Sequence, residues 1–156
     1  MDRYPMTPKG HEKLVAELKH LREVERPANV KAIEEARAHG DLSENAEYKY
    51  AKEQQSLIAG RIEYIEDRIS RAEVIDPSRL SGERVVFGAK VTMENLDTEE
   101  ESCYRIVGED EADLGQGTIS ITSPIARGLI RKEVGDEVTI ATPAGPRKFE
   151  IIDVEF

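Results

Sequence analysis

The sequence predicts an α+β protein, in which an N-terminal antiparallel coiled-coil hairpin is followed by a small α+β domain. Up to residue 76, apolar residues recur every three or four positions, which is the period of a helix face. From Arg84 onward they alternate with polar residues, which is the period of a strand. Pro77 and Gly82 lie between the two patterns and indicate a linker. We therefore expect a hairpin over residues 1–76, a linker over 77–83 and the α+β domain over 84–156.

The first helix is expected to begin at Pro8 with Thr7 as its N-cap, because a proline is tolerated in the first helical position. Pro27 should kink or locally interrupt this helix, and Gly40 should end it. The predicted seam starts with leucines and narrows to alanines: Leu14, Leu18, Leu21, Ala28, Ala32 and Ala36.

The second helix has a clearer seam, in which spacings of three and four alternate as in a coiled coil. Its residues are Tyr48, Ala51, Gln55, Ile58, Ile62, Ile65, Ile69 and Ala72. Two such helices joined by a short turn pack antiparallel. The turn that contains Asp41 and Glu44 is then the far tip of a rod on the order of 45 Å long.

The C-terminal part has the alternating pattern of strands in five segments, which are residues 84–94, 102–108, 118–123, 136–142 and 147–156. A short helix interrupts them, with Ser123 as its N-cap and Pro124 as its first residue. This order of elements predicts a small α+β domain.

Composition excludes several classes of function. Charged residues make up 35% of the chain and the net charge is −10, which argues against sequence-independent binding to exposed nucleic acid. Cys103 is the only cysteine, so no disulfide can form within the chain. His11, His20 and His39 show no zinc-ligand spacing with it or with each other.

Without a signal peptide or an apolar run of about 20 residues, the protein is expected to be cytoplasmic, with no membrane association.

Asp41 and Glu44 allow two interpretations that do not exclude each other. The spacing Asp-x-x-Glu at a helix start matches a capping box, with Asp41 as N-cap and Glu44 at the third helical position. The same two carboxylates, at the tip of a rod, offer oxygen ligands suited to Mg²⁺. They are too few for a tight site, so they would complete a site whose other ligands come from a partner.

Five segments of the chain carry a family resemblance: MTPKGHEKLVAELKHL, EARAHGDLSENAEYKYAKEQQ, RVVFGAKVT, YRIVGEDEAD and ISITSPIARGLIRKEVGDEV. Together they resemble the Gre family of bacterial transcript cleavage factors, over essentially the whole chain and in family order. GDLSENAEY and SPIARGLI are the most specific of these motifs. The resemblance implies an N-terminal coiled coil and a C-terminal FKBP-like domain; the fold alone does not imply prolyl isomerase activity.

The resemblance also implies an accessory factor that is not itself an enzyme. Such factors bind bacterial RNA polymerase and insert the coiled coil through its secondary channel. In a backtracked complex, Asp41 is expected to help coordinate a Mg²⁺ shared with the polymerase, while Glu44 assists the metal or orients the attacking water. The polymerase then cleaves the 3′ end of the nascent RNA. The isolated protein is expected to be a monomer without a bound cofactor.

Two further sets of residues have a role implied by the resemblance. Arg37 and Lys52 flank the tip and are expected to contact the 3′ segment of the RNA, although they could also be solvated charges, with Lys52 paired to a glutamate of its own helix. The docking surface for the rim helices of the channel is expected at Ser123, Pro124, Ile125, Ala126 and Arg127, which could also be only a helix start.

Three alternatives stay open. An inhibitory relative would occupy the same channel without promoting cleavage, but the Asp41/Glu44 pair disfavours it. A GreB-type sibling is disfavoured by the small basic patch and by SPIARGLI. In a coiled-coil adaptor or chaperone without chemistry, the two carboxylates would only cap a helix.

Overall fold

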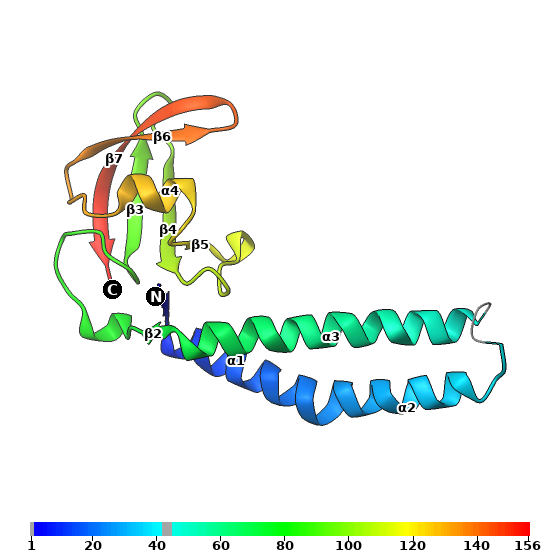
Figure 1. Ribbon diagram of the computed structural model, residues 1–156. Helices are drawn as coiled ribbons and strands as arrows, with labels where there is room; N and C mark the ends of the chain where they lie inside the picture. The colour runs from blue at the N-terminus through cyan, green and yellow to red at the C-terminus, as the bar shows by residue number, and fades with distance from the viewer. Residues whose placement is uncertain (1, 42–44) are drawn as a thin grey trace. The chain divides into compact units, whose positions relative to one another are not determined.

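The computed structural model describes residues 2–41 and 45–156 and divides the chain into two compact units (Figure 1). One unit comprises His11–Arg71, and the other comprises the segment up to Gly10 together with Ala72–Phe156. The predicted α+β class is confirmed: a long helical hairpin precedes a domain built on a curled sheet. None of the helices in the described residues combines the length and the apolar character that a membrane crossing requires.

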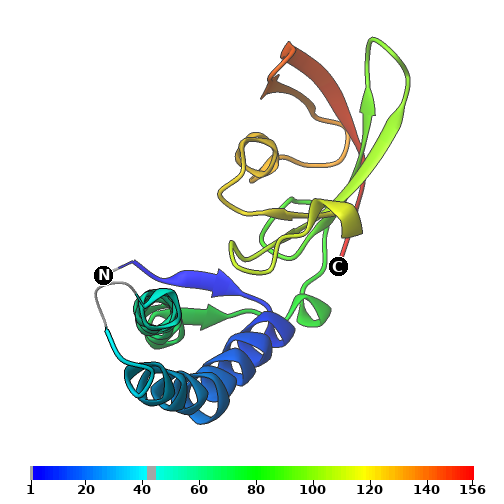
Figure 2. The same cartoon turned by 90° about the vertical axis from the view of Figure 1, so that its right-hand side faces the viewer.

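The hairpin has two arms that lie side by side, as Figure 2 shows in a view along the helices. The first arm consists of α1 (Pro8–His20), a π-helical turn over Leu21–Glu25, and α2 (Arg26–Arg37). The second arm is the single helix α3 (Ala46–Ser70), whose 25 residues give it a length of about 37 Å. As predicted, α1 starts at Pro8, and the Thr7 hydroxyl accepts a hydrogen bond from the Gly10 amide at 3.1 Å.

The π turn is the local interruption that Pro27 was predicted to cause. A proline ring clashes with the carbonyl four residues earlier, and proline has no amide hydrogen to donate. In this turn the Arg26 amide bonds to the Leu21 carbonyl, five residues back, so the arm accommodates one extra residue.

That extra residue shifts the seam of the first arm. The prediction that Ala28 and Ala32 lie in the seam is wrong, because both are exposed. After Leu14 and Leu21, the buried residues of this arm are Asn29, Ile33 and Ala36. In α3, Ala51, Ile62 and Ile65 are buried, whereas Gln55, predicted in the seam, is exposed and Gln54 is half-buried.

The second unit contains two sheets. A short parallel pair joins β1 (Tyr4–Met6) to β2 (Ala72–Val74). The larger sheet has the strand order β5-β4-β3-β7-β6, in which only the β4–β5 pair is parallel. Its strands are β3 (Lys90–Asn95), β4 (Glu101–Val107), β5 (Thr118–Ser120), β6 (Glu137–Thr142) and β7 (Gly145–Glu155). Single 3₁₀ turns lie at Pro77–Arg79 and Leu114–Gln116.

The core of this unit lies between the sheet and α4 (Pro124–Leu129), around which the sheet curls (Figure 2). Alternate residues of β3, Val91 and Met93, point into it, and Ala126 and Leu129 of α4 are fully buried. The predicted strand over residues 84–94 is shorter in the structure and starts at Lys90. Before it, Val85 exchanges backbone hydrogen bonds with the segment after α4 instead of with a strand.

The segments before and after the hairpin belong to the sheet unit because β1 pairs with β2. The predicted boundaries had assigned residues 1–10 and 72–76 to the hairpin. Glu111 reinforces this grouping, because its carboxylate accepts hydrogen bonds from the Thr7 amide at 2.9 Å, from the Thr7 hydroxyl and from the Gly108 amide at 3.0 Å. The local periodicity of the sequence cannot predict pairing between strands that lie far apart in the chain, such as β1 and β2.

Candidate functional site

The turn between α2 and α3 forms the far end of the hairpin and contains the predicted acidic pair (Figure 1). α2 ends at Arg37, and Gly40 follows with a φ of 110°, a backbone conformation that favours glycine. Asp41, the next residue, is exposed. Glu44, its predicted partner, lies outside the described residues. The structure thus places one carboxylate at the end of the hairpin, and the pairing of Asp41 with Glu44 stays a prediction.

The residue that caps α3 is Asn45, so the predicted capping box with Asp41 as N-cap is wrong. The Asn45 side-chain oxygen accepts a hydrogen bond from the Tyr48 amide at 3.0 Å. Its amide nitrogen donates to the Ala36 carbonyl at 2.7 Å, near the end of α2. An aspartate caps a helix as well as an asparagine does, but its carboxylate cannot donate the second bond. Asn45 therefore ties the two helix ends together, and Asp41 precedes α3.

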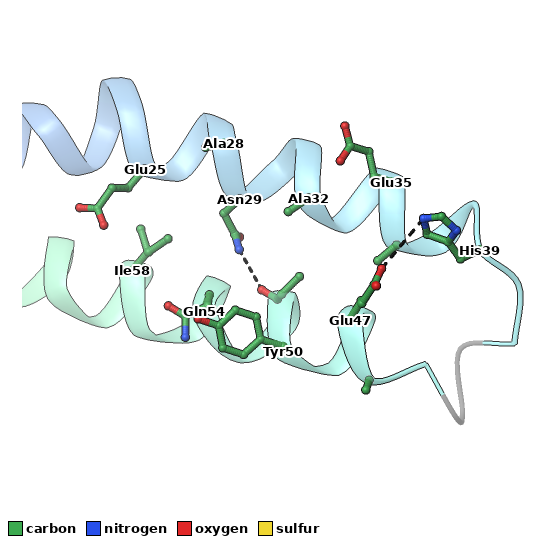
Figure 3. A pocket seen from close by; sticks show the side chains of 13 residues that line it. Glu25, Ala28, Asn29, Ala32, Glu35, His39, Glu47, Tyr50, Gln54 and Ile58 are labelled. Carbon is green, nitrogen blue, oxygen red and sulfur yellow. Dashed lines mark hydrogen bonds and ion pairs between the residues drawn. The ribbon is translucent and has the colours of Figure 1, made fainter.

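Asn29 forms a second polar link between the arms, deeper in the hairpin. It is 8% exposed, and its amide donates to the Ala51 carbonyl at 2.9 Å (Figure 3). The predicted seam did not include this residue because it contained Ala28 instead. Asn29 falls among the alanines and isoleucines of the seam only when the shift caused by the π turn is included. The sequence pattern without that shift therefore does not identify it. A single buried asparagine in a coiled coil fixes the register of the helices at some cost in stability.

Arg37 and Lys52, the predicted RNA contacts, lie on the same edge of the hairpin. Each comes one residue after a buried alanine, Ala36 and Ala51, and so points about 100° away from the seam. The Arg37 guanidinium lies 5.8 Å from the centre of the Tyr48 ring, on the opposite arm. Lys52 donates to the Gln55 side chain at 2.8 Å, not to a glutamate. We call Arg37, Tyr48 and Lys52 the basic edge.

The opposite edge of the hairpin is hollowed by a groove of about 660 Å³ between α2 and α3 (Figure 3). Its lining includes residues one position before buried seam residues, such as Glu35 and Tyr50. Ala28 and Ala32, which the π turn excludes from the seam, also line it. We call this side the groove edge. The basic edge and the groove edge thus carry different side chains at similar distances from the tip of the hairpin.

The predicted docking segment lies in the sheet unit and forms the start of α4. The Ser123 hydroxyl caps this helix by accepting a hydrogen bond from the Ala126 amide at 3.2 Å, as predicted. Ala126 is fully buried, Ile125 is half-buried, and Pro124 and Arg127 are exposed. Of the five predicted residues, Pro124 and Arg127 therefore offer the most surface to a partner.

The donor chemistry at the tip fits Mg²⁺, which prefers carboxylate oxygens and keeps several water ligands. Asp41 supplies an exposed carboxylate of this kind. Among the residues that the structure describes, no group of three His, Cys, Asp or Glu side chains converges on a potential metal site. A metal held at Asp41 would consequently need ligands from outside the described part of the chain.

Comparison with known proteins covers both units. The family described as "Transcription elongation factor, N-terminal" matches residues 4–74, and the family described as "Transcription elongation factor, GreA/GreB, C-term" matches residues 80–156. The curated "Transcription elongation factor GreA" of Hyphomonas neptunium is 60% identical over 156 residues, which are 100% of this chain and 99% of the relative. That of Beijerinckia indica is 58% identical with the same coverage.

A solved structure is also similar in sequence over its whole length. It is that of GreA factor homolog 1 (Gfh1) of Thermus thermophilus, which is 28% identical, covers 99% of both chains and has a TM-score of 0.45. The curated relatives and the two family matches, which span the hairpin and the sheet unit, carry the assignment.

Proposed function

Because this chain belongs to the GreA/GreB family of transcription elongation factors, we propose that it binds bacterial RNA polymerase and stimulates cleavage of the nascent RNA in backtracked complexes. The chain enters the secondary channel of the polymerase with the tip of its hairpin. The polymerase performs the cleavage, and this protein acts as an accessory factor that completes the active site. The rescued complex then resumes elongation.

The observation that carries this proposal is the exposed position of Asp41 at the end of a two-helix rod. Two packed helices are narrow enough to enter a channel that a globular domain cannot enter. Asn45 caps α3 and bonds to the end of α2, and Asp41 precedes this link as an exposed residue. A carboxylate so placed reaches a site that the protein does not itself enclose.

Asp41 and Glu44 would hold Mg²⁺ jointly with the polymerase. The metal, when bound, stabilises charge on the phosphate and lowers the pKa of a bound water. Asp41 supplies a charged oxygen ligand, and Glu44 accepts a hydrogen bond from the attacking water and so orients it. The pair adds no catalytic power until the partner supplies the remaining ligands.

The basic edge would receive the extruded RNA. Arg37 and Lys52 provide two positive charges beside the tip, in a chain whose net charge is −10. Such a small cationic surface suits a short segment of single-stranded RNA that is already held in the polymerase, and not general binding to nucleic acid. In the sheet unit, Pro124 and Arg127 would contact the rim helices of the channel, with Ser123, Ile125 and Ala126 shaping the surface beneath them.

The test uses a stalled, backtracked RNA polymerase complex with labelled RNA, Mg²⁺ and the full-length protein. We expect RNA shortened from its 3′ end. Asp41→Asn and Glu44→Gln should reduce the cleavage rate by about 100-fold or more, as when one group that stabilises charge in a transition state is removed. Both variants should keep their helical content and their affinity for the polymerase.

Three results would contradict the proposal. Uncut RNA with the wild-type protein bound would favour the inhibitory alternative. Normal cleavage by Asp41→Asn would mean that the tip assignment is wrong even though the family is right. Absence of binding to the polymerase would favour an adaptor without chemistry.

A further inference from the structure

The groove edge is built as a recess with a small apolar floor. Alanines of both arms form that floor: Ala28, Ala32, Ala36, Ala46 and Ala51. Tyr50 stands beside them with 64% of its surface exposed. Figure 3 shows Asn29 reaching toward α3, and His39 and Glu47 pointing toward each other across the space between the arms. The floor leaves room for a side chain that neither arm supplies.

The rim of the groove is acidic. Of the described residues that line it, Glu25, Glu35 and Glu47 are carboxylates and none is lysine or arginine. Glu25 and Glu47 lie 3.8 and 4.0 Å from the imidazoles of His20 and His39, which are cations only when protonated. The nearest lysine contact is the one between Lys31 and Glu35, at 4.0 Å on the surface of α2. These distant contacts leave most of the negative charge on the rim uncompensated.

This charge determines the class of molecule that fits. RNA phosphates would be repelled by three carboxylates around a shallow recess. Lysine and arginine have aliphatic stems that pack on apolar surface and charged ends that reach carboxylates. An arginine or lysine can also stack on an exposed tyrosine ring such as Tyr50. A cationic polypeptide segment therefore matches the floor, the rim and the ring together.

We propose that the groove edge docks a basic polypeptide segment of the RNA polymerase, which places a lysine or arginine between Tyr50 and the glutamate rim. The inference rests on the proposed function, since it supposes that the hairpin enters the polymerase. It also orients the hairpin about its long axis. Because the basic edge and the groove edge face opposite ways, the RNA lies on one side of the hairpin and this protein contact on the other.

Site-specific crosslinking tests the orientation directly. A photoreactive phenylalanine analogue replaces Tyr50 in one full-length variant and Arg37 in another, and each is irradiated in the backtracked complex. We expect the probe at position 50 to label a polymerase peptide that contains lysine or arginine, and the probe at position 37 to label RNA. Labelling of RNA from position 50, or no labelling in a complex that still cleaves, would overturn the proposal.

Substitutions in the groove test its contribution to affinity. Ala32→Met fills the recess, and the double variant Glu35→Gln with Glu47→Gln removes two rim charges. We expect each to raise the Kd for the polymerase complex by about tenfold or more, as for contacts at the centre of an interface. The matched control is Ala59→Met, because Ala59 is exposed on the same side of α3 as Lys52 and does not line the groove. All three proteins should melt at the wild-type temperature.

The outcomes separate this inference from the proposed function. If wild-type protein cleaves and Ala32→Met binds as tightly as wild type or more tightly, the groove proposal fails and the cleavage factor stands. If wild-type protein neither binds nor promotes cleavage, both fail together. Weaker binding by Ala32→Met and by the rim variant, with an unchanged Ala59→Met control, would support a side chain of the polymerase in the groove.

Discussion

The side-chain amide of Asn29 donates a hydrogen bond to the backbone carbonyl of Ala51, 2.9 Å away on the opposite arm of the hairpin. Asn29 is buried in the hairpin core, and its neighbours in the seam are Ile33 and Ala36. The bond can form in only one register of α2 against α3. It therefore favours that register of the two helices.

Asn29→Ala should lower the free energy of unfolding by about 1 kcal/mol, the usual net value of one buried hydrogen bond. Urea unfolding followed by the helical circular dichroism signal measures the change. Val30→Ala, at an exposed position next to it, serves as the control and should have little effect. An unchanged midpoint for Asn29→Ala would show that the link does not stabilise the hairpin.

Asn45 should matter through both of its hydrogen bonds. Asn45→Ala removes the N-cap of α3, which costs about 1 kcal/mol, and also breaks the link to Ala36. Asn45→Asp keeps the cap but loses the donor, so its effect should be intermediate. Hydrogen exchange at the first amides of α3 measures the fraying of the helix end. Equal effects of the two substitutions would mean that the link to Ala36 adds nothing.

Gly10 and Glu111 should show coupled effects on stability. A Cβ atom added at Gly10 would overlap the carboxyl group of Glu111, which cannot simply move because the two bonds to Thr7 and the one to Gly108 hold it. Gly10→Ala should therefore destabilise the protein more in the wild-type background than in Glu111→Ala. Thermal unfolding of the two single variants and the double variant gives the coupling energy, on the order of 1 kcal/mol for residues in contact. Strictly additive effects would contradict the close approach.

The ion pair between Glu17 and Arg61 should make the hairpin slightly acid-sensitive. Two hydrogen bonds from the Arg61 guanidinium, at 2.6 and 2.9 Å, lower the pKa of Glu17 below its ordinary value of 4.5. A lowered pKa in the folded state stabilises the protein above the ordinary value, and the contribution is lost as the pH falls through the lowered pKa. Both side chains are partly exposed, so the contribution is small, roughly 0.2–1 kcal/mol.

Glu17→Gln should remove this contribution at pH 7 and have a smaller effect at pH 3, where less of the carboxyl group is ionised. The melting temperatures of both proteins at the two pH values provide the measurement. A loss of the same size at both pH values would assign the effect to packing instead of ionisation.

Arg37→Ala and Lys52→Ala should weaken the binding of the backtracked complex in a salt-dependent way. For each side chain that binds an RNA phosphate, its removal should reduce the slope of log affinity against log salt by about 0.7, the value for single-stranded nucleic acid. Affinity measured across a salt series gives the slope. Lys19→Ala, an exposed charge at the end of α1 away from the tip, is the control. A change in affinity without a change in slope would indicate that the side chain binds protein.

Local sequence signals predicted the elements that depend on neighbouring residues. Thr7 and Pro8 start α1, and Ser123 and Pro124 start α4, because caps and first-turn prolines act within a few residues. The strands of the five-stranded sheet were predicted from their period of two, although β3, the first of them, begins later than expected, at Lys90.

Two kinds of feature could not be predicted from the sequence. Some depend on residues far away in the chain, and others depend on which of several locally similar conformations forms. The pairing of β1 with β2 joins residues separated by the whole hairpin. Asp41 and Asn45 are both good N-caps, and the second hydrogen bond from Asn45 to Ala36 favours Asn45. A proline in a helix can cause a kink, a break or a π turn, so Pro27 alone did not determine the phase of α2.

The π turn at Leu21–Glu25 sets the rotational phase of the distal half of the first arm. One added residue turns everything after it by about 100° about the helix axis. Without it, Ala28 and Ala32 would lie against α3, and Asn29 and Ile33 would turn out of the seam. Arg37 and Glu35 would each turn by about 100° away from the edges that they now occupy. A single π turn thus determines the direction in which the side chains near the tip point, several helical turns away from the π turn itself.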